Sequence, residues 1–161
     1  MTFTVEDGTG LPTANSYASA ATADAYFSDR GVSSWTGSET VKQQALVRAT
    51  DYIDRMFGKR FLDVPLTDTQ ALAFPRMELG LPTCVVYACC EYALRELTAR
   101  LAPDPVYDNS GFKLKLKKTI VGPIETTKEF SSNIPDSPRS YPNADKLLSS
   151  VLRSSNTVTR Q

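Results

Sequence analysis

The sequence has no histidine and only 3 cysteines among its 161 residues. Without an imidazole it can form neither a Ser-His-Asp triad nor a Cys-His pair, and a mixed Cys/His zinc site is excluded as well. The cysteines follow a C-x4-C-C spacing, at Cys84, Cys89 and Cys90, that matches no common zinc or dithiol motif. Because adjacent helical positions diverge by about 100 degrees, we interpret these cysteines as small core residues. We find no catalytic constellation, and we predict no enzymatic activity, no metal and no cofactor.

The chain also lacks long apolar runs. The longest, Cys84 to Cys90, is far shorter than the roughly 20 residues that a membrane-spanning helix needs. The first residues, Met1 to Asp7, have neither the basic flank nor the apolar block of a signal peptide. We therefore expect a protein that does not span a membrane and that stays in a reducing compartment.

A net charge of one sign is absent too, because 18 basic residues balance 18 acidic ones. This balance argues against the uniformly basic surface of a dedicated nucleic-acid binder. The total nevertheless hides a division of charge along the chain. Residues 1–111 carry 9 basic and 14 acidic side chains, 9 − 14 = −5, whereas residues 112–161 carry 9 and 4, 9 − 4 = +5.

Helical periodicity dominates the first two thirds of the chain, where apolar residues recur three and four positions apart. Trp35 lies in a connection rich in Ser, Thr and Gly, and we predict that it folds back as a core anchor. The predicted helical segments are a first helix capped by Ser19 and ended by Gly31, a second with Thr36 and Glu39 as a capping box and Gly58 at its end, a short piece over Thr69–Phe74, a long helix from about Pro82 to about Ala102, and a short helix from Asn143.

From Phe112 the periodicity changes to the two-residue alternation of a strand with one buried face. Gly122 and Pro123 offer a turn into a second strand over 124–130, so a hairpin is the natural interpretation, with a single kinked strand as the alternative. We predict a mainly α fold, a bundle of about four helices over residues 1–111. A β-hairpin extension and a flexible arm with a short helix follow over 112–161 and do not form an independent domain.

The strand contains the one feature that implies a partner, a run of lysines at Lys113, Lys115, Lys117 and Lys118. These positive charges suit phosphate or an acidic protein surface, and we predict that they bind a partner. Lysines also protect an exposed sheet edge against aggregation, and we give this interpretation comparable weight. The residues between the lysines are mostly leucine, which argues against base stacking on this strand.

Two other patterns have simple interpretations. Asp51 and Asp54 lie three positions apart on the second helix, and Arg48 and Arg55 nearby favour a surface ion-pair network over a carboxylate pair. The run of residues 8–10, Gly-Thr-Gly, lacks the Lys-Ser/Thr of a phosphate loop, so we interpret it as a turn.

Several segments together resemble a family found in tailed-phage genomes, whose members are often labelled DnaT-like single-stranded DNA-binding protein. In helical layout and gene setting these members resemble the head-to-tail connector, adaptor or head-completion proteins of the phage neck, and we give this second description more weight. The segments are Val5–Pro12 with Asn15–Tyr17, Ala25–Phe27 with Arg30 and Gly31, Ala45–Ile53, Gln70–Arg76 and Val121–Glu125.

The neck resemblance implies a structural virion protein of a tailed bacteriophage, without catalytic residues. It implies a homo-oligomeric ring, a dodecamer, that binds the portal protein ring and the tail-side neck or tail proteins, and through which packaged DNA passes. Its place would be the head-tail interface of the virion, after assembly in the host cytoplasm. An acidic first part and a basic last part could supply the two unlike patches of such a ring interface.

The alternative is a DnaT-like accessory protein of replication that binds single-stranded DNA. The same lysines and the usual label of the family motivate this interpretation. The salt dependence of DNA binding separates it from the neck adaptor, because phosphate neutralisation weakens steeply as salt rises.

Overall fold

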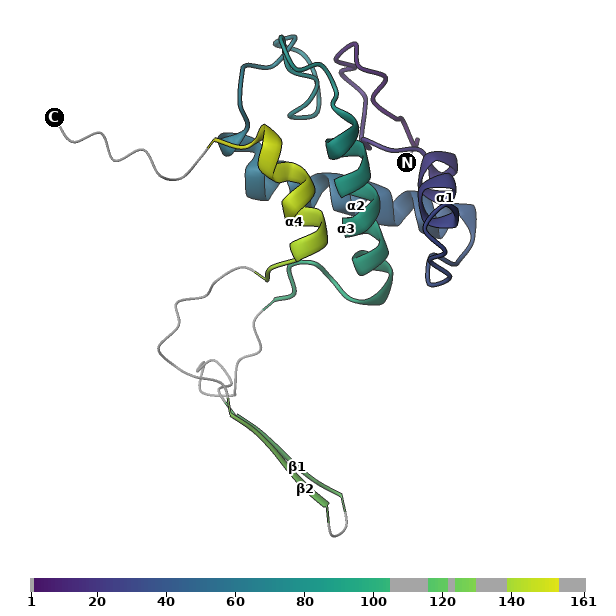
Figure 1. Cartoon of the computed structure of the whole chain (residues 1–161), viewed down its shortest axis with the longest axis vertical. Coiled ribbons are helices and arrows are strands. Elements are labelled where there is room, and N and C mark those ends of the chain that lie inside the picture. Colours follow the sequence, from purple (N-terminus) through teal and green to yellow (C-terminus); the bar gives the residue numbers. More distant parts are fainter. Residues whose placement is uncertain (1, 105–115, 122–123, 130–138, 154–161) are drawn as a thin grey trace, which may run out of the picture. The chain divides into compact units, whose positions relative to one another are not determined.

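The computed structural model describes residues 2–104, 116–121, 124–129 and 139–153. Two compact units divide the chain: one combines Met1–Leu101 with Ser140–Gln161, and the other is Ala102–Arg139. The predicted mainly α class is confirmed. The helices are α1 Ala20–Ser28, α2 Glu39–Phe57, α3 Thr83–Thr98 and α4 Pro142–Leu148, with short 3-10 turns η1 Gly58–Arg60 and η2 Ser149–Val151 (Figure 1).

The start of α1 agrees with the sequence, and the start of α2 does not. Ser19 Oγ accepts a hydrogen bond from the Thr22 N–H at 3.0 Å, as expected of an N-cap. For α2 the predicted cap at Thr36 is wrong, because the helix begins at Glu39 and is capped by Ser38. The reason is Gly37, whose φ of 121° no right-handed helix allows.

Two further helix predictions need correction. Residues 69–74 form no helix, because the Gln70 side chain binds the local backbone instead: its amide nitrogen donates to the carbonyls of Leu72 (2.7 Å) and Pro75 (3.1 Å). The long helix α3 ends at Thr98 rather than near residue 102. There the Glu96 carboxylate accepts the Leu101 N–H at 2.9 Å and turns the chain back into the core.

The helical unit is built around α2 and α3, with α1 and α4 packed against them. Trp35 is buried as predicted, and its indole N–H donates to Asp24 at 2.7 Å. Cys89 and Cys90 are also buried in the core, and burial raises the pKa of the Cys89 thiol to about 11. Within the described ranges no group of three or more metal-ligating residues is close enough to hold an ion.

Three tyrosine hydroxyls tie distant segments together by donating to carboxylates. Tyr17 donates to Asp54, Tyr26 to Glu91 and Tyr92 to Asp145, and the tyrosines themselves are buried. These bonds join the segment before α1 to α2, α1 to α3, and α3 to α4. The helical unit is therefore cross-linked by polar contacts as well as by its apolar core.

The predicted surface ion pair is confirmed for Asp51, and the prediction is wrong for Asp54. Asp51 is exposed and pairs with Arg55 at 3.5 Å. Asp54 is turned inward, where it accepts hydrogen bonds from the Tyr17 hydroxyl and from the Ala73 N–H at 2.9 Å. Burial raises the pKa of this carboxyl, although the Tyr17 hydrogen bond opposes the shift.

The Gly-Thr-Gly run is a turn, as predicted, and a buried carboxylate organises it. Glu6 accepts the N–H groups of Gly8 (3.0 Å), Gly10 (2.9 Å) and Leu11 (2.9 Å). Both glycines have positive φ, 96° and 82°, a conformation that side chains disfavour. The turn thus satisfies its own backbone donors internally.

The second unit contains two strands, β1 Leu116–Val121 and β2 Ile124–Glu129, which pair antiparallel with Val121 opposite Ile124. The predicted turn at 122–123 and the predicted strand residues 112–115 lie outside the described residues. The hairpin extension and the boundary at residue 111 therefore stay predictions.

The short helix α4, which the sequence places in the C-terminal arm, belongs to the helical unit. None of the helices in the described part of the chain is long and apolar enough to cross a membrane.

Candidate nucleic-acid interface

The lysine run falls only partly within the described residues. Lys113 and Lys115 lie outside them, whereas Lys117 and Lys118 belong to β1. The strand register places Lys117 opposite Lys128 and Lys118 opposite Thr127.

A second set of basic residues lies on the exposed face of α2. Helical periodicity places Arg48, Asp51 and Arg55 along one face of this helix, and all three are exposed. The Arg55 pair with Asp51 is solvent-exposed and contributes little. This face therefore carries two cations, Arg48 and Arg55, that lie about two helical turns apart.

Arg48 is the better fixed of the two arginines. Its Nε donates to Glu96 at 2.8 Å, and the Glu96 side chain is 7% exposed while that of Arg48 is 47% exposed. The second Glu96 oxygen is held by the Leu101 N–H. A guanidinium has five N–H donors, so Arg48 keeps donors for a further partner while Glu96 holds its Nε.

Beyond the end of α2, three cations gather in what we call the basic corner: Lys59, Arg60 and Arg153. The backbone N–H of Arg153 donates to the Arg60 carbonyl at 2.8 Å, which brings Arg153 beside Arg60 and its chain neighbour Lys59. All three are exposed, and none forms an ion pair with any residue of the described ranges. The corner could not be predicted from the sequence, because only the fold brings Arg153 beside Arg60.

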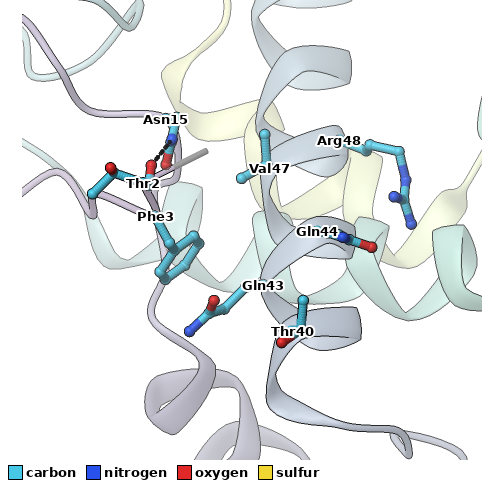
Figure 2. Close-up of a pocket in the computed structure, with 8 residues that line it drawn as sticks. All are labelled: Thr2, Phe3, Asn15, Thr40, Gln43, Gln44, Val47 and Arg48. Carbon is cyan, nitrogen blue, oxygen red and sulfur yellow. Dashed lines mark hydrogen bonds between the residues drawn. The ribbon is translucent and has the colours of Figure 1, made fainter.

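Near the start of α2, the segment before α1 lies across the helix and leaves a cleft of about 350 Å³, which we call the α2 cleft (Figure 2). Phe3 stands on one side of the helix in this view and Arg48 on the other. Among its eight lining residues Phe3 and Val47 are apolar and Arg48 alone is charged. The lining residues are Thr2, Phe3, Asn15, Thr40, Gln43, Gln44, Val47 and Arg48.

An amide clamp fixes the wall of the cleft that carries Phe3. The Asn15 side chain donates to the Thr2 carbonyl at 2.7 Å and accepts the Thr4 N–H at 3.0 Å. These bonds hold the backbone on both sides of Phe3. The half-buried ring is therefore positioned by the backbone as well as by its own contact with the core.

Other basic residues of the helical unit have structural roles. Lys42 pairs with Asp24 at 2.8 Å and is 17% exposed. Arg76 is buried: its guanidinium donates to the carbonyls of Asp63 (3.2 Å) and Gly58 (3.3 Å) and lies over the Phe61 and Phe74 rings. Arg76 thus serves packing.

The comparison with family models identifies the chain over its whole length. Residues 1–161 match the family described as "Putative DnaT-like ssDNA binding protein". No curated protein and no solved structure matches the chain.

This match overturns the prediction of a tailed-phage head-to-tail connector. Nothing in the comparisons indicates a virion neck protein, so the interpretation as an adaptor ring on the portal is wrong. The error arose because we gave helical layout more weight than the family label, and a small helical bundle hosts many unrelated functions. The chain belongs to the DnaT-like single-stranded DNA-binding family.

Proposed function

We propose that the protein binds single-stranded DNA as an accessory of replication and catalyses no reaction on it. The observation that carries the proposal is the match of the complete chain to the DnaT-like family. The printed family description names single-stranded DNA as the ligand, and it supports the alternative interpretation of the sequence.

The geometry offers places for the phosphate backbone. Arg48 and Arg55 follow the exposed face of α2, and the basic corner continues beyond the end of that helix. Charge is thus concentrated locally, although residues 1–111 are acidic in total. A strand of DNA that follows α2 would meet cations at intervals along the helix, which suits binding without sequence preference.

The lysine run provides further phosphate contacts in this proposal. We propose that residues 112–130 form the predicted β-hairpin and that Lys113, Lys115, Lys117 and Lys118 contact the DNA backbone. Because few aromatic residues accompany these lysines, the hairpin supplies charge rather than base stacking.

Fluorescence anisotropy with labelled oligothymidylate, titrated at several salt concentrations, tests the proposal. Each neutralised phosphate of single-stranded DNA contributes about −0.7 to the slope of log K against log salt, so a slope of about −2 or steeper is expected. A duplex of the same length serves as the control and should bind more weakly. Absence of binding at low salt, or equal affinity for the duplex, would contradict the proposed function.

A variant with the four lysines 113, 115, 117 and 118 changed to Gln tests the role of the hairpin. Its salt slope should be less steep than that of the wild type, by about 0.7 for each phosphate that the variant no longer neutralises. Replacement of Arg95, Arg100, Lys146 and Lys42 by Gln removes the same charge elsewhere and is the matched control. An equal decrease of slope in both variants would mean that only net charge matters.

A further inference from the structure

We infer that the α2 cleft holds one nucleobase of the DNA strand, with Phe3 as the stacking surface and Arg48 on an adjoining phosphate. The inference rests on the proposed function and deepens it, because it names the part of the nucleotide that each side of the cleft recognises. A volume of about 350 Å³ lies at the lower end of the range for small-molecule pockets, which suits a single base.

The stacking surface is the first element of the site. Phe3 is half-buried, so part of its ring contacts the core and part lines the cleft. Val47 of α2 is the second apolar residue of the lining. Since the Asn15 clamp fixes the backbone on both sides of the ring, little conformational freedom is lost when a base stacks on it.

Amide side chains form the second element. The Gln43 amide nitrogen donates to the Glu39 carboxylate at 3.1 Å, which orients the amide and leaves its oxygen to accept. Gln44 is exposed one residue further along α2 and also lines the cleft. Amides both donate and accept, so they can satisfy the edge of any base, as a binder without sequence preference requires.

Arg48 supplies the charge complementarity that selects a nucleotide over a neutral peptide. None of the eight lining residues is acidic, although the surrounding residues 1–111 carry an excess of acidic side chains. The carboxylates of Glu39 and Glu96 contact the lining residues Gln43 and Arg48 and are engaged by them. A base on the Phe3 side and a phosphate on the Arg48 side would lie across α2, in the arrangement that Figure 2 shows for these side chains.

The test compares oligothymidylate with an abasic oligonucleotide of the same length, about 16 nucleotides. The variant Phe3→Leu keeps an apolar side chain but removes the ring, and Phe3→Trp keeps an aromatic surface. We expect Phe3→Leu to weaken oligothymidylate binding about tenfold while affinity for the abasic strand stays unchanged, and Phe3→Trp to retain wild-type affinity for both. Equal weakening of both probes by Phe3→Leu, or no weakening at all, overturns the inference.

Arg48→Gln tests the phosphate side of the cleft. This variant should weaken binding of both probes and make the salt slope less steep by about 0.7. Lys42→Gln removes the same charge from the same helix outside the cleft and should leave the slope as it is. Identical slopes for wild type and Arg48→Gln contradict the assigned role of Arg48.

The two proposals fail in different ways. If the wild-type protein binds oligothymidylate but is insensitive to Phe3 and Arg48, the cleft is not the base site and the DNA-binding function stands. If the wild type binds neither probe at low salt, the proposed function falls and the cleft assignment falls with it. Circular dichroism and thermal unfolding of each variant check that the helical unit remains folded.

Discussion

The two ends of α2 differ in the chemistry that they present to solvent. Near its start, the α2 cleft combines an aromatic ring, amide groups and a single arginine. Beyond its end, the basic corner has three exposed cations. The Arg60 guanidinium lies 6.0 Å from the centroid of the Phe57 ring. Under the proposed function, the cleft end would hold a base on a fixed surface with Arg48 on one phosphate, whereas the corner would contribute charge alone.

Among changes to α2 and its two ends, removal of the basic corner should have the largest effect on DNA affinity. In a variant with Lys59, Arg60 and Arg153 all changed to Gln, the salt slope should become less steep by about 2, because up to three phosphates are no longer neutralised. Oligothymidylate and abasic strands should be weakened equally, in contrast to the effect of Phe3→Leu. Anisotropy titrations at several salt concentrations measure both quantities. If the abasic strand were affected much less than oligothymidylate, the assignment of charge to one end and base to the other would be wrong.

Release of the Asn15 clamp should have a moderate effect confined to the cleft. Asn15→Ala removes the hydrogen bonds to Thr2 and Thr4 and frees the backbone around Phe3. We expect about threefold weaker binding of oligothymidylate, unchanged binding of the abasic strand, and a decrease of about 1 kcal/mol in unfolding free energy. Thr13→Ala, at an exposed neighbouring position, is the control. Unaltered oligothymidylate affinity in Asn15→Ala would show that the ring does not need its clamp.

Titration of Asp54, on the buried side of α2, should change the folding stability with pH. Of the changes considered, it should have the smallest effect on DNA binding. Burial raises the pKa of Asp54 above its ordinary value of 3.8, so the folded protein holds a proton here more tightly than the unfolded chain does. This contribution to stability is present below pH 3.8 and is lost as pH rises through the folded pKa. Relative to Asp54→Asn, which cannot titrate, the wild type should therefore gain stability as pH falls from neutral toward 4.

Chemical denaturation of both proteins at several pH values measures this difference. DNA affinity at neutral pH should change little in Asp54→Asn, because the side chain faces the Tyr17 hydroxyl and the Ala73 N–H rather than the exposed face of α2. If the wild type gained no stability relative to Asp54→Asn toward acid pH, the assigned protonation behaviour would be contradicted.

Local signals in the sequence predicted local structure well. Ser19 was identified as a helix cap and the Gly-Thr-Gly run as a turn, because each depends on neighbours within a few residues. Trp35 was identified as a core anchor, and it meets Asp24 and Phe27 from the preceding helix. The boundary of α2 was missed for a similar local reason, since the positive φ of Gly37 outweighed the capping-box spacing of Thr36 and Glu39.

Features that depend on distant residues could not be predicted. Asp54 was expected on the surface because nothing in its helix reveals that Tyr17 and Ala73 meet it from other segments. The basic corner needs Arg153 beside Arg60, and the α2 cleft needs Phe3 beside α2. The sequence carried no local signal for the cleft, because Phe3 and Asn15 lie far apart along the chain and Phe3 precedes Val5, where the first segment that resembles the family begins.

The buried thiols have a practical consequence for fluorescence measurements of the proposed DNA binding. Cys89 and Cys90 are fully buried, and burial raises the pKa of Cys89 to about 11, so neither offers a thiolate to an alkylating dye in the folded protein. Cys84, which is half-buried, is the remaining native thiol and can be replaced by Ser. A cysteine introduced at an exposed position such as Gln44 would then be the single labelling site, and its fluorescence would report the arrival of DNA at the rim of the cleft in real time.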